Sequence, residues 1–93
     1  MIPLQTAMFY VYIIQSVQSR RFYTGFTSDL RKRFNQHNQN LSNYTKGRGP
    51  YKLIYYEGCV NKFDAMTREK YLKSGFGKRY IKNRLKRFLS ATG

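Results

Sequence analysis

The chain has 93 residues, enough for one domain with a single hydrophobic core, and this length excludes a second module of ordinary size. Eighteen Lys and Arg against four Asp and Glu give a formal net charge of +14, which excludes a near-neutral surface and is typical of proteins that bind a polyanion. The charge favours nucleic acid as the partner, with an anionic membrane surface as the open alternative.

Compartment is the next property that the composition bears on. No apolar run approaches the roughly 20 residues that a membrane-spanning helix needs, and the N-terminal residues lack the basic start of a secretion signal. The single cysteine, Cys59, cannot build a disulfide framework. We therefore expect a cytoplasmic protein that does not contact membranes, with Cys59 as a small buried apolar residue.

A β-hairpin is the first predicted element, after an N-terminal tail over residues 1–8. Residues 9–16 (FYVYIIQS) and 22–26 (FYTGF) are rich in β-branched and aromatic side chains, and a polar stretch separates them. Helix-capping side chains follow, and apolar residues then recur at helical spacing. This pattern predicts a first helix over about Asp29–Asn38.

The middle of the chain predicts a loop, a strand and a second helix. Residues 40–50 (NLSNYTKGRGP) are rich in Gly, Asn and Ser and predict a basic, mobile loop suited to meeting a ligand. Residues 52–57 (KLIYYE) predict a third strand, well buried because four apolar or aromatic residues follow one another. Asp64 is expected to cap the second helix, which Gly75 ends.

The last predicted element is a third helix that begins near Gly77 or Lys78, with an apolar face and basic residues around the rest of its surface. The order β-β-α-β-α-α predicts one α+β domain over residues 9–89, in which helices pack on a small sheet. Residues 90–93 then form a C-terminal tail.

Two tyrosines, an arginine and a histidine are the candidate catalytic residues. Tyr12 and Tyr23 lie on the two strands of the hairpin, so their phenols can point to one face. Arg33 and His37 stand at i and i+4 of the first helix, hence side by side. Phenol, guanidinium and imidazole groups together can activate water, bind a phosphate and shuttle a proton, as cutting a phosphodiester requires. Plain sheet tyrosines and a solvated surface arginine are the structural alternatives.

The shortage of acids bears on the metal, because a two-metal nuclease usually needs several carboxylates to hold its ions about 4 Å apart. Asp29 and Asp64 are explained as helix-start residues, and Glu57 closes a strand. Glu69 lies on the apolar stripe of the second helix and is the best ligand candidate, with an i,i+4 ion pair to Lys73 as the alternative. We expect one Mg²⁺ or Mn²⁺ ion, held by one carboxylate, substrate oxygens and water.

In order and spacing, these residues resemble the GIY-YIG nuclease domain, in particular its small stand-alone members, which are related to the N-terminal nuclease domain of an excision-repair protein. The resemblance covers about Phe9 to Leu89. It is carried by YVY at 10–12, YTG at 23–25, the loop YTKGRGP at 44–50 and the segment TREKYLK at 67–73. It implies a three-stranded sheet flanked by helices and a metal-dependent cut of a DNA strand by an activated water.

The resemblance also implies roles for the candidate residues. The positions that match the family's motifs are Tyr12, Tyr23, Gly25, Arg33, His37 and the metal-binding Glu69. One phenol would accept the proton of the attacking water, and the other phenol and His37 would orient that water. Arg33 would bind the scissile phosphate, and the metal would stabilise the leaving 3′ oxygen.

The chain departs from the family's pattern at three places. Tyr10 and Val11 stand where the first motif has Gly and Ile. No lysine follows directly after Gly25, and Asn83 is the candidate for the asparagine that many members carry near the end of the domain. These departures bear on whether the site is active.

Basic residues of the loop and of the third helix are the candidate nucleic-acid contacts: Lys46, Arg48, Lys78, Arg79 and Lys82. We expect a monomer that binds DNA mainly through its backbone, with RNA as an open alternative. Specificity, for example for repair intermediates, would come from DNA shape or from a protein partner. A catalytically silent nucleic-acid-binding module on the same scaffold is the alternative function, and a structural interaction protein is a third.

Overall fold

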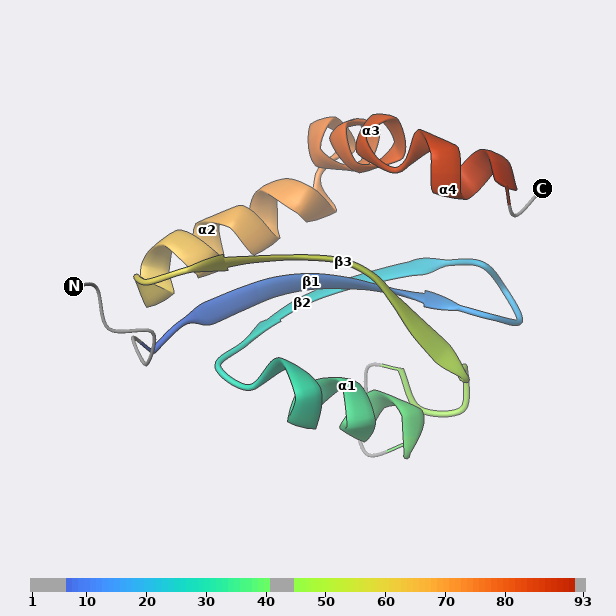
Figure 1. The fold of residues 1–93 in the computed structure, drawn as a ribbon, viewed down its shortest axis with the longest axis horizontal. Coiled ribbons are helices and arrows are strands. Elements are labelled where there is room, and N and C mark those ends of the chain that lie inside the picture. The colour runs from blue at the N-terminus through green and yellow to red at the C-terminus, as the bar shows by residue number, and fades with distance from the viewer. Residues whose placement is uncertain (1–6, 41–44, 92–93) are drawn as a thin grey trace.

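The fold is a small antiparallel sheet between helices (Figure 1). The computed structural model describes residues 7–40 and 45–91. The sheet has three strands in the order β2-β1-β3, so β1 is central and the other two are edges. The strands are β1 (Phe9–Ser16), β2 (Phe22–Thr27) and β3 (Tyr51–Cys59), and the helices are α1 (Leu30–Asn38), α2 (Lys62–Lys73), α3 (Gly75–Arg84) and α4 (Lys86–Ala91).

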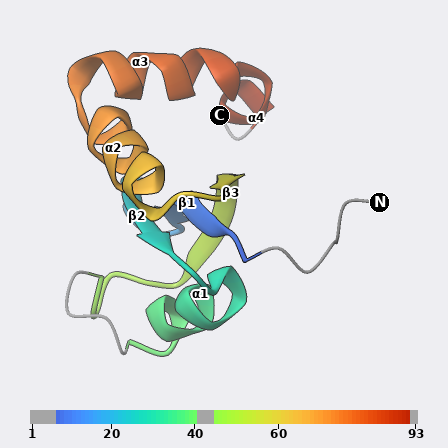
Figure 2. The ribbon, with the colours of Figure 1, turned by 90° about the vertical axis from the view of Figure 1, so that its left-hand side faces the viewer.

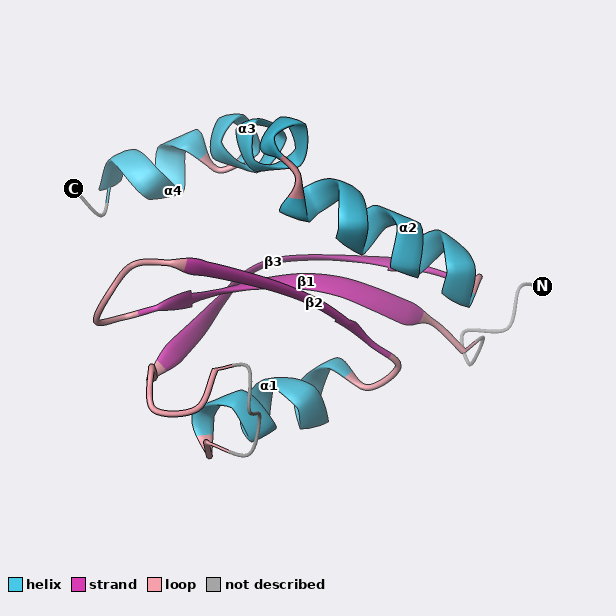
Figure 3. Ribbon diagram, turned by 180° about the vertical axis from the view of Figure 1, so that it is seen from behind, coloured by secondary structure: helices cyan, strands magenta, loops and turns pink. Residues whose placement is uncertain are grey.

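The helices lie in two layers, with α1 on one face of the sheet and α2, α3 and α4 on the other (Figures 2 and 3). Side chains of a strand alternate between faces, so the central strand supplies both cores. Val11 and Ile13 pack in the cluster that includes residues of α2 and α3. Tyr12 and Ile14 pack in the cluster under α1. The alternation of β1 therefore decides which face each candidate catalytic side chain joins.

The predicted start of α1 agrees with the structure, and the predicted start of α2 does not. Asp29, one of the expected helix-start residues, is the cap of α1, because its side chain accepts a hydrogen bond from the backbone N–H of Lys32 at 3.1 Å. The prediction that Asp64 caps α2 is wrong. Asn61 is the cap, and Asp64 lies in the first turn of the helix, where a negative charge interacts favourably with the helix dipole.

The C-terminal helices also differ from the expected boundaries. Ser74 ends α2 and caps α3, so Gly75 begins a helix rather than ending one. A Cβ at Gly77 would lie 2.5 Å from the Cα of Leu72, and this glycine therefore lets α3 pack closely on the end of α2. The predicted third helix is divided at Leu85 into α3 and α4. The α+β class is confirmed.

Burial of the third strand was overestimated. Because β3 is an edge strand, its apolar run is only partly covered, and Tyr56 is 54% exposed. Cys59 is half-buried beside the α2 cluster, and burial raises the pKa of its thiol. No helix within the described ranges is long and apolar enough to cross a membrane.

Candidate active site

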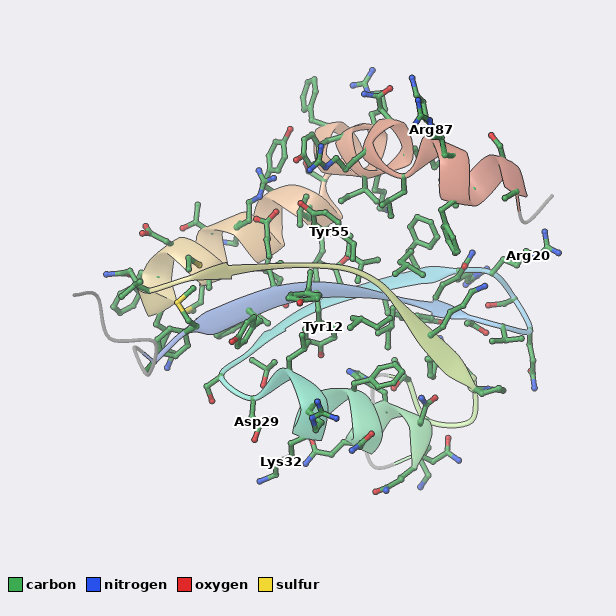
Figure 4. The ribbon with its side chains drawn as sticks, viewed as in Figure 1. Tyr12, Arg20, Asp29, Lys32, Tyr55 and Arg87 are labelled. Atoms are coloured by element: carbon green, nitrogen blue, oxygen red, sulfur yellow. The ribbon has the colours of Figure 1, made fainter. Side chains whose placement is uncertain are left out.

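The register of the hairpin places the two motif tyrosines on the α1 face. Tyr12 pairs with Gly25, and Tyr23 pairs with Ile14. Tyr12 points from β1 towards α1 (Figure 4), and both tyrosines belong to the cluster under that helix. As diagonal neighbours across a strand pair, their long side chains are within reach of the same region. The predicted phenol pair on one face is therefore present.

Gly25 is what allows the ring of Tyr12 to lie flat against β2. A Cβ at position 25 would stand 2.5 Å from the hydroxyl oxygen of Tyr12 and 2.7 Å from its Cζ, far inside normal contact. The glycine is thus a steric requirement of the phenol's position. This gives the glycine of the second motif a physical role in this chain.

His37 is the inner partner of Tyr12. The Tyr12 hydroxyl lies 2.8 Å from Nε2 of His37, and the Thr45 hydroxyl lies 2.6 Å from Nδ1. The histidine is 1% exposed. Burial, reinforced by the nearby charge of Arg33, lowers the pKa of His37 to about 4. The imidazole is therefore neutral at physiological pH, with one nitrogen a donor and the other an acceptor.

Tyr23 occupies the outer side of the same cluster. Its ring makes an edge-on contact with Tyr51 at 5.5 Å between centroids, and Tyr51 makes a similar contact with His37 at 6.2 Å. Arg48 hydrogen bonds to the Tyr23 hydroxyl, which raises the pKa of Arg48. Tyr12 and Tyr23 are only 3% and 7% exposed, yet Tyr23 lines a groove of about 350 Å³ together with Arg21 and Arg48. Of the two tyrosines, Tyr23 is therefore the one that lines this groove.

Arg33 lies one helical turn before His37 on α1, as the sequence predicted. Its Nη1 donates to Oε1 of Gln36 at 3.1 Å, and its charge acts on His37. The side chain is half-buried at the edge of the helix. A cation therefore lies close to the Tyr12–His37 pair, where it can stabilise negative charge that develops beside them.

Glu69 lies on α2, across the sheet from α1. Its carboxylate is paired with Lys73 at 3.3 Å. Its partner Lys73 lines a hollow with Phe22 and Thr24 of β2. The structure brings Tyr12, Tyr23, Arg33 and His37 together on one face of the sheet, while Glu69 lies on the helix that covers the other face (Figure 2).

The side chains that could bind a metal ion here would hold it only weakly. Among residues 7–40 and 45–91, no group of three or more His, Cys, Asp and Glu side chains could enclose an ion. One partly exposed carboxylate does suit Mg²⁺, which keeps several waters and takes the rest of its ligands from substrate phosphate. Glu69 can fill that role once Lys73 releases it, at the small cost of an exposed i,i+4 pair.

The candidate nucleic-acid contacts fall into separate groups. Lys46 and Arg48 lie in the described part of the loop, residues 45–50. Two hydrogen bonds tie that part of the loop to the end of β1 and the residue after it: Ser16 Oγ donates to the Arg48 carbonyl at 2.8 Å, and the Val17 N–H donates to the Pro50 carbonyl at 2.9 Å. These contacts do not agree with the prediction of a mobile loop there. Residues 41–44 lie outside the described ranges.

A basic groove joins the hairpin to α3. Lys78 and Lys82 line a hollow of about 350 Å³ with Arg20 and Arg21, around the ring of Phe22. Arg20 points outward at the hairpin end (Figure 4). Because Arg21 also lines the groove of Tyr23, the two hollows adjoin. Arg79 instead lies outside this lining and stacks its guanidinium over the exposed Phe76 at 5.0 Å.

Sequence reasoning missed several contributors to this region: Arg20, Arg21, Thr45 and Tyr51. Arg20 and Arg21 contribute to the net charge of the sequence, but nothing in the sequence indicates that they lie opposite α3. Thr45 and Tyr51 contact His37 only through tertiary packing. The YT string before the basic loop was the available signal, but nothing in it identified a hydrogen-bond partner.

The fold and the clustered phenols, imidazole and guanidinium define a class of protein. The GIY-YIG catalytic domain model matches residues 8–86, and the chain belongs to the GIY-YIG family. Membership implies a nuclease-type function and suggests nucleic-acid binding, and nucleases of this family generally use a divalent metal ion.

The more particular relatives are small UPF0213 proteins. UPF0213 protein CPE1444 from Clostridium perfringens is 46% identical over 67 residues, which cover 71% of either chain. UPF0213 protein OB0043 from Oceanobacillus iheyensis is 37% identical over 65 residues, which cover 69% of this chain and 74% of that one. The solution NMR structure of UPF0213 protein BH0048 from Bacillus halodurans is similar with a TM-score of 0.50 at 32% identity, covering 80% of this chain and 81% of that chain. This likeness supports the α+β fold.

Proposed function

We propose that the protein is a divalent-metal-dependent DNA endonuclease with low sequence specificity. The observation that carries the proposal is the cluster in which Tyr12, Tyr23, His37 and Arg33 meet on one face, beside a groove lined by cations. Hydrolysis needs a proton acceptor, a water-orienting donor and a cation for the phosphate, and the cluster supplies each.

The roles follow from position. Tyr23 faces the groove, so we assign its phenolate the proton of the attacking water, and Arg48 beside it stabilises negative charge on that oxygen. The water oxygen bonds to phosphorus as the bond to the 3′ oxygen breaks, and the released 3′ oxygen takes a proton from solvent. Tyr23 then returns its extra proton to solvent. Tyr12, held by His37, orients the water, and Arg33 stabilises the charge of the pentacoordinate phosphorane.

Glu69 is the residue that would hold the metal. When bound, a divalent ion supplies electrostatic stabilisation of the leaving oxygen. Because β2 is an edge strand, a nucleic-acid strand that crosses this edge meets Tyr23 on one side and approaches Glu69 on the other. The arrangement supports one ion, Mg²⁺ or Mn²⁺, because Glu57 is paired with Arg68, Asp29 caps α1 and Asp64 lies in the first turn of α2.

Binding would depend on phosphates rather than bases. The groove between the hairpin and α3 carries Arg20, Arg21, Lys78 and Lys82, and no acidic side chain of the described residues lines it. Such a groove follows a backbone and reads no sequence. Preference would then come from DNA shape or from a partner protein, and the domain would act as a monomer.

Salt dependence tests the binding half of the proposal. Replacing Lys78 and Lys82 together by Gln should lower the slope of log affinity against log salt by about 2. Lys32→Gln with Lys62→Gln removes the same charge outside the groove and serves as the control. Equal losses in the two double variants would show that the groove is not the contact surface.

Nicking of supercoiled plasmid with Mg²⁺ or Mn²⁺ tests the catalytic half. Arg33→Ala should lower the rate about 10²- to 10³-fold, as for loss of one charge-stabilising donor, while Arg31→Ala, on the exposed side of the same helix, should not. Glu69→Gln should abolish metal-dependent nicking, and Asp64→Asn on the same helix should not. Binding by the wild type without nicking would assign the protein instead as a silent binding module, and parallel RNA substrates decide between the two nucleic acids.

A further inference from the structure

Phe22 lies in the basic groove between the hairpin and α3. Four cations line the hollow around it, namely Arg20, Arg21, Lys78 and Lys82, and none of the acids in the described ranges does. The side chain is only half-buried, and it packs on the cluster that β1 forms with α2 and α3. The hollow of about 350 Å³ is at the small end of the range of ligand sites, about 300–1,000 Å³. It therefore suits one flat ring system and not a double helix.

An aromatic ring among cations is the arrangement with which proteins bind single-stranded nucleic acid. The flat face of an unpaired base stacks on the ring, and the cations attract the phosphates on either side of that base. In a double helix the bases already stack on one another, so their faces are covered and only phosphates and groove edges are offered. The ring of Phe22 would add nothing to the binding of such a duplex, whereas the four cations would attract either form.

The path from this groove to the tyrosine cluster turns round an edge of the sheet. Phe22 and Tyr23 are adjacent in β2, so their side chains lie on opposite faces. Phe22 packs with the α2 cluster and Tyr23 with the cluster under α1, and Arg21 lines the hollows of both. A ligand that occupies both hollows must therefore turn round the start of an edge strand. An unpaired chain can make this turn, whereas a double helix, with a persistence length of about 150 base pairs, resists it.

The groove also adjoins the surroundings of the candidate metal ligand. Phe22 and Lys78 line a second hollow, of about 260 Å³, together with Lys73, and Lys73 is the ion-pair partner of Glu69. The groove of Phe22 thus has a neighbouring hollow lined by Tyr23 and another lined by the partner of Glu69.

We propose that Phe22 is a stacking platform for an unpaired base, and that the ligand of this groove is a single-stranded segment of DNA, such as a flap or a gap. For its meaning in cleavage this inference rests on the proposed function, but the binding itself requires no cleavage. The stacking is tolerant of sequence, because every base has a flat face, and it agrees with a groove that follows the backbone. It adds a preference for unpaired over paired DNA.

Fluorescence anisotropy without divalent metal tests the binding. A labelled single strand and its duplex are compared at about 0.15 M salt, where the attraction of phosphates is screened beyond about 8 Å, and we expect the single strand to bind more tightly. Phe22→Leu keeps an apolar side chain in the core, so it should lower the affinity for the single strand roughly five- to hundredfold and change that for the duplex by less than about twofold. Phe26→Leu is the matched control, because Phe26 packs on the same cluster but does not line the groove.

NMR of the wild type supplies a test that needs no variant. A base stacked on Phe22 should move the ring-proton resonances of this residue upfield when the single strand is added, and the duplex should not. Unmoved resonances at saturating single strand, duplex binding as tight as single-strand binding, or equal losses in the two Leu variants would each overturn the proposal. Preferred binding of the single strand without cleavage of any DNA would refute the endonuclease and leave the stacking platform standing. Cleavage by a wild type that prefers duplex would do the reverse.

Discussion

Substitution of Gly25 by Ala tests whether the position of Tyr12 matters for catalysis. The added methyl would stand 2.5 Å from the phenol oxygen, about 0.9 Å short of the 3.4 Å of ordinary contact. The ring must therefore move by roughly 1 Å, which breaks its 2.8 Å contact with His37. A displacement of that size can lower a rate about 10²-fold, and overpacking should cost about 1–3 kcal/mol of stability.

The assay is plasmid nicking combined with thermal melting, and Gly75→Ala is the matched control because a methyl there meets nothing within 4 Å. The decisive comparison is a double-mutant cycle with Tyr12→Phe. If Gly25 acts through the phenol, Gly25→Ala should cost little further activity once the hydroxyl is gone. A folded Gly25→Ala variant that nicks at the wild-type rate, or a full extra loss in the Tyr12→Phe background, would refute the reasoning.

Three further outcomes are expected. The pKa of His37 is about 4 in the folded state against 6.5 in the unfolded state, so the free energy of unfolding should be highest above pH 6.5 and should fall by about 2 kcal/mol between pH 7 and pH 5. Urea titrations at several pH values measure this fall. A His37→Gln variant whose free energy of unfolding depends on pH to the same extent would contradict the prediction. Arg68 binds Glu57 and stacks between two tyrosine rings. Arg68→Met should therefore lower the free energy of unfolding by about 1 kcal/mol, which corresponds to about 4–8 °C in melting temperature, and should leave nicking unchanged. A loss of nicking in folded protein would contradict a purely structural role. Glu69→Gln should lose nicking at every Mg²⁺ concentration but melt within about 0.5 kcal/mol of the wild type, because it gives up only the exposed pair with Lys73; rescue by excess metal would point to ligands elsewhere.

The hairpin and the first helix could be predicted closely, because their signals are local. A run of β-branched and aromatic residues predicted β1, and Asp29, one of the expected helix-start residues, is the cap of α1. The exposure of β3 could not be predicted, because the same apolar run can occur in a central strand or in an edge strand. The strand order β2-β1-β3, which the sequence does not show, makes β3 an edge strand. The start of α2 was misjudged because Asn61 and Asp64 both suit a cap, and the chain used the earlier one.

The site was predictable as a set of residues but not as a network. Spacing alone brought Arg33 and His37 together and placed Tyr12 and Tyr23 on paired strands. The contact of His37 with Thr45 is made by a residue outside any helix or strand, and such a position has no sequence periodicity from which the contact could be predicted. The face of Glu69 likewise depends on which side of the sheet α2 covers, which the crossover after β3 decides.

In the proposed function, a metal ion would depend on a single acidic residue of this chain. Of the four, Glu57 binds Arg68 and the Tyr55 hydroxyl, and Asp29 caps α1. Asp64 lies in the exposed first turn of α2. Glu69 is the remaining acid, and it is partly buried and paired with Lys73. If the proposed function holds, the cations of the groove would hold the substrate, and its phosphate would bring most of the metal's ligands. Substrate binding and metal binding would then be coupled, so a very basic surface could serve a metal-dependent reaction.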